Sequence, residues 1–374
     1  MSMPSASAAP FREMYARACG PEPRDVAGPR ELTGIRPQLA GLGLDVLADR
    51  ARAFAAAELA ACRELLSGPA REVLARRALL ACAPLGLMSG AWLQWLTCPG
   101  NADDETAMRL LTLYAADVGA GQPDASRGAA YLALLRGQGL ARYAVPAGRL
   151  ALDRRVADWC FELPAVLLAM SRQPEEFAPE IAGADLCLRT VGPLPPLAAL
   201  DDVAGTALDP GSARHGARPG IELSSDVADA LAAAGQSERV TSGFAWALGL
   251  LADFAARLRA DLASARDPSY EMAELLRARS REACAYHQDY QLDGRPLADW
   301  LREARADPAG LLTALAGSKL IRPGRPAASP LLGSLISARG PMFRVFAPED
   351  LAVIRRWIAS LPRGHKPAGP AAGT

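Results

Sequence analysis

The residues that could hold a metal or activate a nucleophile are few and far apart. The chain has only three histidines, His215, His287 and His365, and contains no phosphate-binding glycine loop, no GxSxG elbow and no HExxH helix. A histidine-rich metal site is therefore excluded by number. We expect His215 in a long loop and His365 in a polar tail, both solvated. His287 ends a helical pattern three residues after Cys284, where a structural or capping role competes with a functional one.

The seven cysteines are widely spaced and form no CxxC pair. This pattern supports neither a disulfide framework nor a structural zinc, and it favours a reducing cytoplasm. Cys160 and Cys187 lie in apolar stretches and are predicted to be buried, inert thiols. The net charge is zero without a block of basic residues, so nothing favours nucleic acid or an anionic membrane. The N-terminus lacks the apolar stretch of an export signal.

Several short strings are more specific than these single residues. In chain order they are SGAWLQWL (89–96), LYAADVGAG (113–121), FELPAVLLA (161–169), FAPEIAGADLCLR (177–189), SGFAWAL (242–248) and ARGPMFRVF (338–346). In this order and spacing they resemble the bacterial "iron-containing redox enzyme" family, a branch of the heme-oxygenase-like diiron oxidases, over roughly residues 75–362. The resemblance implies an all-α, heme-oxygenase-like bundle whose inward carboxylates and histidines bind two irons and activate dioxygen.

The first ligand element of the family is altered here. It is a glutamate in an Asp-Glu-x-Gly-x-Gly string, followed ten residues later by a histidine. The glutamate position falls on Asp117 and the histidine position on Arg127. Arginine is a permanent cation and cannot ligate a metal.

The later elements are altered as well. A His-x3-Asp-x5-His pattern of the family aligns with Ala234, Glu238 and Phe244, and a further glutamate falls on Arg189. Glu180 of the Pro-Glu-x-x-Gly string is kept. With no imidazole at these positions, we expect no normal diiron centre and no cofactor.

The remodelled positions suggest two uses for the same side chains. Asp117 and Arg127, with Glu238 and Arg189, are expected to form a salt-bridged network that holds the core together. Alternatively, the emptied cavity binds a small, carboxylate-bearing substrate through Arg127, with Asp117 or Glu238 as general base or acid. The other side chains expected around such a substrate are Tyr131, Glu180, Arg189, Phe244 and His287.

Apolar residues recur at helical spacing along nearly the whole chain from Leu44 onward, so the residues above should lie on helices. Asn101, followed by three acidic residues, starts a helix that ends at Gly119. Other helices are expected at 71–80, 126–135, 151–171, 175–190, 224–235, 239–265, 270–287 and 347–361. Residues 192–222 and 321–345 are rich in proline and glycine and predict long loops. We expect a poorly ordered arm over 1–40, one domain over 41–362 and a disordered tail over 363–374.

Three functions remain open at this stage. The first is a metal-independent tailoring enzyme of bacterial specialised metabolism that performs acid–base or cyclisation chemistry. The second is a non-catalytic pseudoenzyme that binds a substrate or an active relative. The third is an atypical iron oxygenase that uses carboxylates and His287. A homodimer is compatible with each of them.

Overall fold

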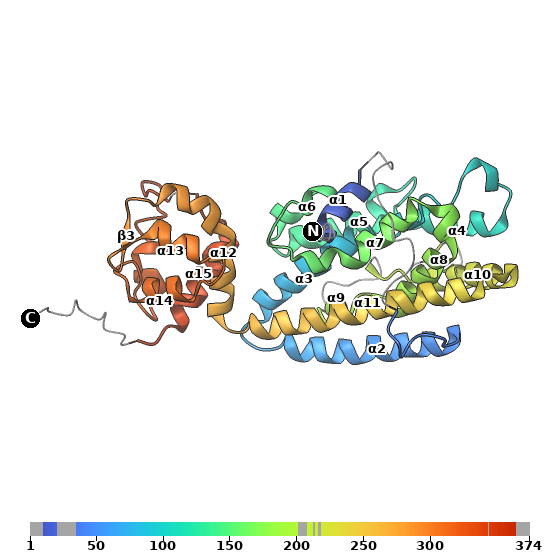
Figure 1. Ribbon diagram of the computed structural model, residues 1–374, viewed down its shortest axis with the longest axis horizontal. Coiled ribbons are helices and arrows are strands. Elements are labelled where there is room, and N and C mark those ends of the chain that lie inside the picture. The colour runs from blue at the N-terminus through green and yellow to red at the C-terminus, as the bar shows by residue number, and fades with distance from the viewer. Residues whose placement is uncertain are drawn as a thin grey trace, which may run out of the picture. The chain divides into compact units, whose positions relative to one another are not determined.

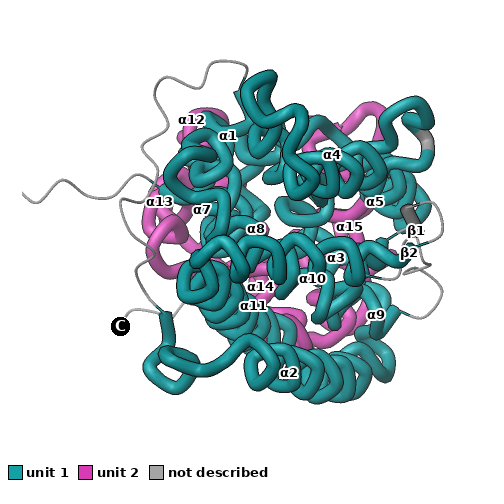
Figure 2. The backbone as a smooth tube through the Cα atoms, turned by 90° about the vertical axis from the view of Figure 1, so that its right-hand side faces the viewer, with its two compact units in different colours: residues 1–262 teal, residues 263–374 magenta. Residues whose placement is uncertain are grey.

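The chain divides into two compact units, residues 1–262 and 263–374 (Figure 2). The computed structural model describes residues 10–20, 35–200, 208–211, 214–215, 218–342 and 344–363. The division differs from the single domain expected over 41–362. Helical periodicity did not reveal it, because helix α11 runs from Ser237 to Ser264 across the boundary without a proline or glycine linker.

Both units are built almost entirely from helices, as predicted (Figure 1). Unit 1 contains α1 (Phe11–Ala18), α2 (Leu44–Leu65), α3 (Arg71–Leu87), η1 (Ala91–Leu93), η2 (Pro99–Asn101), α4 (Glu105–Asp117), η3 (Pro123–Ala125), α5 (Arg127–Gly137), η4 (Ala141–Tyr143), α6 (Ala147–Leu150), η5 (Asp158–Phe161), α7 (Glu162–Ser171), α8 (Pro174–Val191), α9 (Pro195–Ala198), α10 (Gly220–Leu231), the π-helical η7 (Ala232–Gln236) and most of α11. A two-residue hairpin pairs β1 (Arg214–His215) with antiparallel β2 (Arg218–Pro219).

Unit 2 is a smaller helical unit with its own core. It contains α12 (Pro268–Tyr286), the antiparallel pair β3 (Gln291–Leu292) and β4 (Arg295–Pro296), α13 (Leu297–Glu303), α14 (Ala309–Gly317), η8 (Pro326–Ala328), η9 (Pro330–Leu332) and α15 (Pro348–Ser360). Trp357 and Ile354 of α15 are buried against Leu275 of α12 and Leu311 of α14. Sequence reading expected α12 and α15 and missed the short helices α13 and α14.

Close helix crossings in unit 1 rely on glycine. A Cβ atom on Gly183 of α8 would lie 1.9 Å from the carbonyl oxygen of Val240, and one on Gly243 of α11 would lie 2.1 Å from that of Glu180. The backbones of α8 and α11 can therefore meet only because both positions lack a side chain. Helix α2 lies beside α11 (Figures 1 and 2), where Glu58 pairs with Arg259 at 3.2 Å.

The N-terminal region is more ordered than expected. Helix α1 packs against α7, and the Tyr15 ring meets Phe161 edge-on at 5.1 Å between centroids. Tyr15 is fully buried and donates from its hydroxyl to the carbonyl of Pro84 at 2.8 Å. The backbone N–H groups of Phe11 and Arg12 donate to the carboxylate of Asp158. The predicted loose arm is thus wrong for residues 11–18, while residues 1–9 and 21–34 lie outside the described residues.

Two other boundaries also differ from the prediction. The helix expected at 151–171 begins only at Glu162, because Asp153 accepts from the N–H of Arg155 in a local turn that competes with helix formation. The loop expected at 192–222 contains the short helix α9, and α10 begins already at Gly220. The irregular stretch at 321–345 is confirmed over its described residues. Residues 364–374, which include His365, lie outside the described part.

One stretch of the described chain, Arg71–Leu93, is long and apolar enough to cross a membrane by length and composition, and half of its apolar 18-residue window is buried within the protein. It corresponds to α3 and η1. Helix α3 packs against α5 at Gly128, where a Cβ atom would lie 2.9 Å from the carbonyl oxygen of Leu87. Such burial is what a core helix of a folded bundle requires.

Candidate functional site

Three of the predicted residues meet in the buried centre of unit 1. The Arg127 Nε donates to Asp117 Oδ1 at 2.7 Å, and the Arg189 Nη2 donates to Asp117 Oδ2 at 2.6 Å. The exposed fraction of each of these side chains is 4 % or less. Both carboxylate oxygens of Asp117 are therefore bound by guanidinium groups from two different helices, α5 and α8.

The α4–α5 connection explains how Arg127 returns to Asp117. Asp117 is the last residue of α4, and Gly119 then takes a left-handed conformation with φ of 70°. A Cβ atom there would lie 2.5 Å from the carbonyl oxygen of Gln122, so the turn requires glycine. Ser126 caps the next helix by accepting from the N–H of Ala129 at 2.9 Å. Arg127 thus begins α5 directly beside the end of α4.

Asp185 is a fourth member of the cluster that sequence reasoning missed. Its Oδ2 accepts from Arg189 Nε at 2.7 Å and from the Ser224 hydroxyl at 2.8 Å, and its Oδ1 accepts from Trp92 Nε1 at 3.0 Å. Asp185 lies four residues before Arg189 on α8, the spacing at which helical side chains meet. That spacing, within an otherwise apolar stretch, was the signal in the sequence.

Gly90 allows the Trp92 turn to approach the cluster. Its φ is 80°, and a Cβ atom at this position would lie 2.3 Å from the Cβ of Asp117. Only glycine satisfies both the left-handed backbone and the close contact. The SGAWLQWL string therefore contributes a glycine and an indole N–H to the site.

The guanidinium groups also bind the loop that follows α9. Arg127 Nη1 donates to the carbonyl of Asp209 at 2.9 Å, and Arg189 Nη1 donates to that of Pro210 at 2.8 Å. Gly211 lies so close that a Cβ atom would be 2.3 Å from the carbonyl oxygen of Arg189. The cluster, which we call the Arg–Asp network (Asp117, Arg127, Asp185 and Arg189), thereby fixes residues 209–211 on the bundle.

The Arg–Asp network is electrically balanced, with two carboxylates and two guanidinium groups. Burial alone would raise the pKa of Asp117, but Arg189 and Arg127 outweigh this effect and hold the pKa below its ordinary value. Burial would lower the pKa of Arg189, yet Asp185 and Asp117 raise it further above its ordinary range. The charged forms of Asp117 and Arg189 are therefore favoured by each other and by their neighbours in the network.

The other predicted residues of unit 1 do not belong to the network. Tyr131 is fully buried and donates its hydroxyl hydrogen to the carbonyl of Leu79 at 2.6 Å, which makes it a core residue bonded to α3. Glu180 forms a bidentate pair with Arg239, with distances of 2.6 Å to Nε and 2.7 Å to Nη2. Phe244 is fully buried at the α8–α11 crossing.

Glu238 does not belong to the network, and His287 belongs to the other unit. Glu238 is exposed in the first turn of α11, whereas the network is buried. His287 caps the C-terminal end of α12 in unit 2, with its Nδ1 2.7 Å from the carbonyl oxygen of Ala283. The structural interpretation of His287 is therefore the one that the geometry favours.

The donor set does not fit the two irons that the family resemblance implies. A diiron centre needs carboxylate and imidazole ligands with free lone pairs. Both oxygens of Asp117 and both oxygens of Asp185 already accept hydrogen bonds from cationic or neutral donors. Within the described ranges, no group of three or more His, Cys, Asp or Glu side chains is placed to hold a metal ion.

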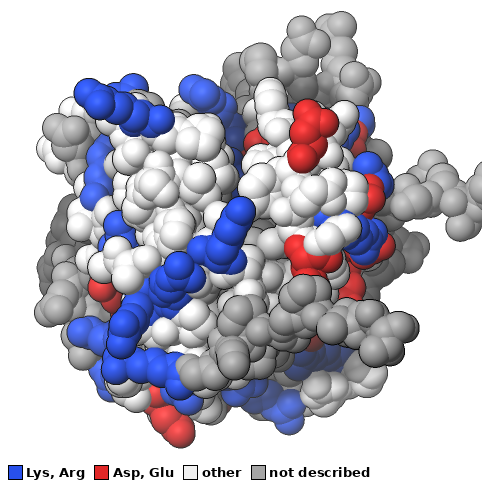
Figure 3. All heavy atoms as spheres, turned by 90° about the vertical axis from the view of Figure 1, so that its left-hand side faces the viewer, with Lys and Arg blue, Asp and Glu red and all other residues white. Residues whose placement is uncertain are grey.

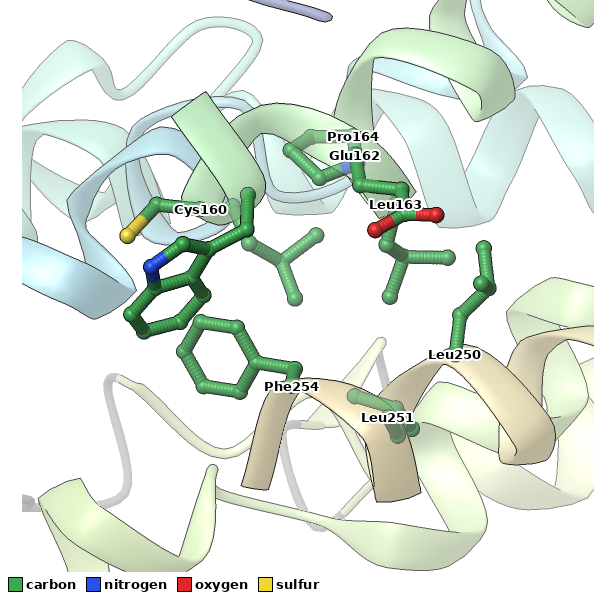
Figure 4. Close-up of a pocket in the computed structure, with 9 residues that line it drawn as sticks. Cys160, Glu162, Leu163, Pro164, Leu250, Leu251 and Phe254 are labelled. Atoms are coloured by element: carbon green, nitrogen blue, oxygen red, sulfur yellow. The ribbon is translucent and has the colours of Figure 1, made fainter. Parts of the chain in front are cut away.

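Two small cavities lie in unit 1. One of about 40 Å³ lies beside Arg127 and is also lined by Ser89, Trp92, Tyr131 and Leu197, among others. The other, of about 20 Å³, lies between the start of α7 and the α11 residues Leu250, Leu251 and Phe254 (Figure 4). A water molecule needs roughly 10–15 Å³ of such space. Neither cavity has the roughly 300 Å³ or more of a typical ligand pocket.

Comparison with known proteins gives no further assignment. No family model, no curated protein and no solved structure matches this chain. The family likeness therefore depends on the six strings alone.

Proposed function

We propose that unit 1 is a metal-free, heme-oxygenase-like bundle in which the Arg–Asp network replaces the iron centre, and that the protein acts as a non-catalytic binding partner. The observation that carries this proposal is the pairing of the two buried carboxylates with permanent cations. Every oxygen of Asp117 and Asp185 accepts a hydrogen bond, and the donors include the guanidinium groups of Arg127 and Arg189, which would repel a metal cation.

Acid–base catalysis receives little support from the same geometry. A general base works best when its pKa lies near the working pH and when it can reach a substrate proton. Two guanidinium groups hold the pKa of Asp117 below its ordinary value, and they occupy both of its oxygens. Glu238, the other proposed acid or base, is exposed and separate from the buried network.

The experiment is an anaerobic ferrous titration of the purified full-length chain, followed by metal analysis and thermal unfolding. We expect less than stoichiometric iron and an unchanged Tm, because a metal that binds only the folded state would raise the Tm. Stoichiometric iron together with a raised Tm would overturn the proposal. An Asp117→Asn variant serves as the control, because any uptake at this site must fall when the carboxylate is removed.

The cavity beside Arg127 favours one second candidate, a metal-independent enzyme for a small carboxylate substrate. Arg127, Ser89 and Trp92 line this space, and guanidinium groups bind carboxylates well. Formate, which is small enough for a cavity of about 40 Å³, should then raise the Tm of the wild-type chain. The effect should disappear in Leu197→Phe, which fills the cavity from its wall. Equal Tm values with and without formate would remove this candidate.

A further inference from the structure

The zero net charge of the whole chain hides an opposite charge on its two units. Unit 2 has 16 Lys and Arg residues against 11 Asp and Glu residues, and unit 1 has 25 against 30. An asymmetry of this kind between the halves of a chain points to an interaction with a charged surface.

The positive charge of unit 2 is concentrated in one segment. Between Asp307 and Glu349 the sequence has no acidic residue. The same stretch has five cations, all exposed: Lys319, Arg322, Arg325, Arg339 and Arg344. We call residues 319–344 the basic segment.

The cations of the basic segment differ from the other arginines of unit 2. Arg279, Arg295 and Arg356 form ion pairs with Asp350, Glu303 and Glu271. Within the described part of the chain, by contrast, Lys319, Arg322, Arg325 and Arg339 form no salt bridge. Their charge is thus available to an outside partner. Figure 3 shows Lys and Arg side chains in a row across one face of the molecule.

The turn of the segment that carries Arg322 and Arg325 is held in place by hydrogen bonds. The buried Ser329 hydroxyl accepts from the N–H of Arg322 at 2.8 Å and donates to the carbonyl of Arg325 at 3.1 Å. The N–H of Gly324 donates to the carbonyl of Ile358 at 2.9 Å, which ties the turn to the end of α15. Arg322 and Arg325 are therefore presented from an ordered turn, and little backbone entropy would be lost on binding.

The composition of the segment favours a protein over a nucleic acid. Protein interfaces are enriched in arginine and depleted in lysine, and four of the five cations of the segment are arginines. Leu332, Leu335 and Ile336 are half-buried within the segment, and Val345 directly after it is 46 % exposed. Binding of single-stranded nucleic acid usually adds exposed aromatic rings on which bases stack. The aromatic residue described in this region, Phe346, is only half-exposed.

The acidic counterpart is present in unit 1. Residues 219–238, from the start of α10 to the start of α11, carry Glu222, Asp226, Asp229 and Glu238 and no lysine or arginine. Arg218 pairs with Glu222 and Asp226, while Asp229 and Glu238 are exposed. A surface with this charge is complementary to the basic segment.

We propose that the basic segment of one chain binds the acidic 219–238 surface of a second copy. Because each copy carries both surfaces, a dimer around a two-fold axis would contain two equivalent contacts. This inference stands on charge and exposure and does not depend on the proposed function. It also gives Glu238 a role that its position on the surface permits.

The test is sedimentation velocity of the full-length chain at several salt concentrations. We expect a dimer at about 50 mM salt that dissociates toward about 500 mM, because salt screens exposed charges. The triple variant K319E/R322E/R325E should weaken dimerisation by about 100-fold or more. The control R71E/R136E/R149E makes the same charge change at exposed arginines of unit 1 and should remain dimeric.

A mixing experiment identifies the two surfaces. The variant D229R/E238R should likewise dimerise weakly when alone. An equimolar mixture with K319E/R322E/R325E should form a dimer again. In the mixed dimer the two unchanged surfaces face each other, and the two charge-reversed surfaces are again of opposite sign. Wild-type protein that is monomeric at all salt concentrations would overturn the proposal, as would a control that dissociates equally. A monomer that instead binds a labelled RNA or duplex DNA in a salt-dependent way would assign the surface to nucleic acid and would also overturn it.

Discussion

Replacement of Arg189 by methionine tests whether the Arg–Asp network stabilises unit 1. The side chain is 1 % exposed and donates four hydrogen bonds, to Asp117, to both oxygens of Asp185 and to the carbonyl of Pro210. After the substitution, two buried carboxylates face the single charge of Arg127. Removal of one partner from a buried ion pair costs about 3–5 kcal/mol, because a charge is left without compensation.

The assay is thermal and urea unfolding followed by circular dichroism. For a unit of this size, about 1 kcal/mol shifts the Tm by roughly 2–4 °C, so Arg189→Met should lower the Tm by roughly 6–20 °C. The matched control is Arg109→Met. Arg109 pairs with Glu105 at 2.5 Å, but the Glu105 side chain is 81 % exposed. An exposed pair of this kind contributes only about 0–1 kcal/mol.

A double variant separates loss of charge balance from loss of packing. Arg189→Met with Asp185→Asn leaves Asp117 and Arg127 as a neutral pair, and the asparagine can still accept from Trp92 or Ser224. We expect it to be more stable than Arg189→Met alone, with a coupling of about 0.5–3 kcal/mol. If Arg189→Met unfolds within 2 °C of the Arg109→Met control, or if the double variant is the less stable one, the electrostatic reasoning is refuted.

Three further predictions concern other features of unit 1. The pKa of Asp117 lies below its ordinary value of 3.8, so the stability that this carboxylate contributes is complete above that pH and is lost as the pH falls through the folded-state pKa. Asp117→Asn should therefore make the unfolding free energy fall less steeply at acid pH. An unchanged acid limb of the stability–pH curve would argue against this. Gly183→Ala places a Cβ 1.9 Å from a carbonyl oxygen and should cost about 1–3 kcal/mol or more in urea unfolding, whereas Gly137→Ala meets no atom within 4 Å and should gain about 0.5–1 kcal/mol. A thiol reagent should label exposed Cys98 in the native protein but buried Cys187, whose pKa is raised by burial, only after unfolding; rapid native labelling of Cys187 would contradict the structure.

The fold class was predictable because helical periodicity and capping residues are local signals. A helix begins where the capping and acidic residues predicted one, although its cap is Asp104, three residues after the expected Asn101; Asp104 accepts from the N–H groups of Thr106 and Ala107. Domain division is not a local property. The pattern of α11 continues through Ser264, so the sequence contained no sign that the core of unit 2 begins there.

The site was partly predictable for a similar reason. The resemblance placed Asp117, Arg127 and Arg189 at corresponding ligand positions, and the structure brings these three together. It also placed Glu238 in the set, but the backbone breaks just before it, where Gly235 has a φ of 81° within the π-helical segment. An alignment carries the spacing of the family and cannot show that a local turn directs a residue to the surface.

The members that were missed are neutral or appear ordinary in the sequence. Trp92 and Ser224 are neutral donors in apolar helical stretches, and such residues are usually interpreted as core or surface. Only the fold brings them to Asp185, from positions 93 and 39 residues away in the chain. Long-range hydrogen bonds of this kind depend on helix packing, and no local pattern encodes them.

The Arg–Asp network has a consequence for the rigidity of the bundle. Two buried carboxylates require about two positive charges nearby, which either iron or guanidinium can supply. Iron would leave open coordination positions for chemistry, whereas each guanidinium directs its remaining N–H groups at fixed angles. Here those groups donate to the carbonyls of Asp209 and Pro210. Arg127 and Arg189 therefore neutralise the buried carboxylates and also hold residues 209–211 on the bundle. Neither side chain can move aside for a substrate without leaving a carboxylate uncompensated in an apolar interior. This rigidity is the physical reason for proposing a binding partner and not a catalyst.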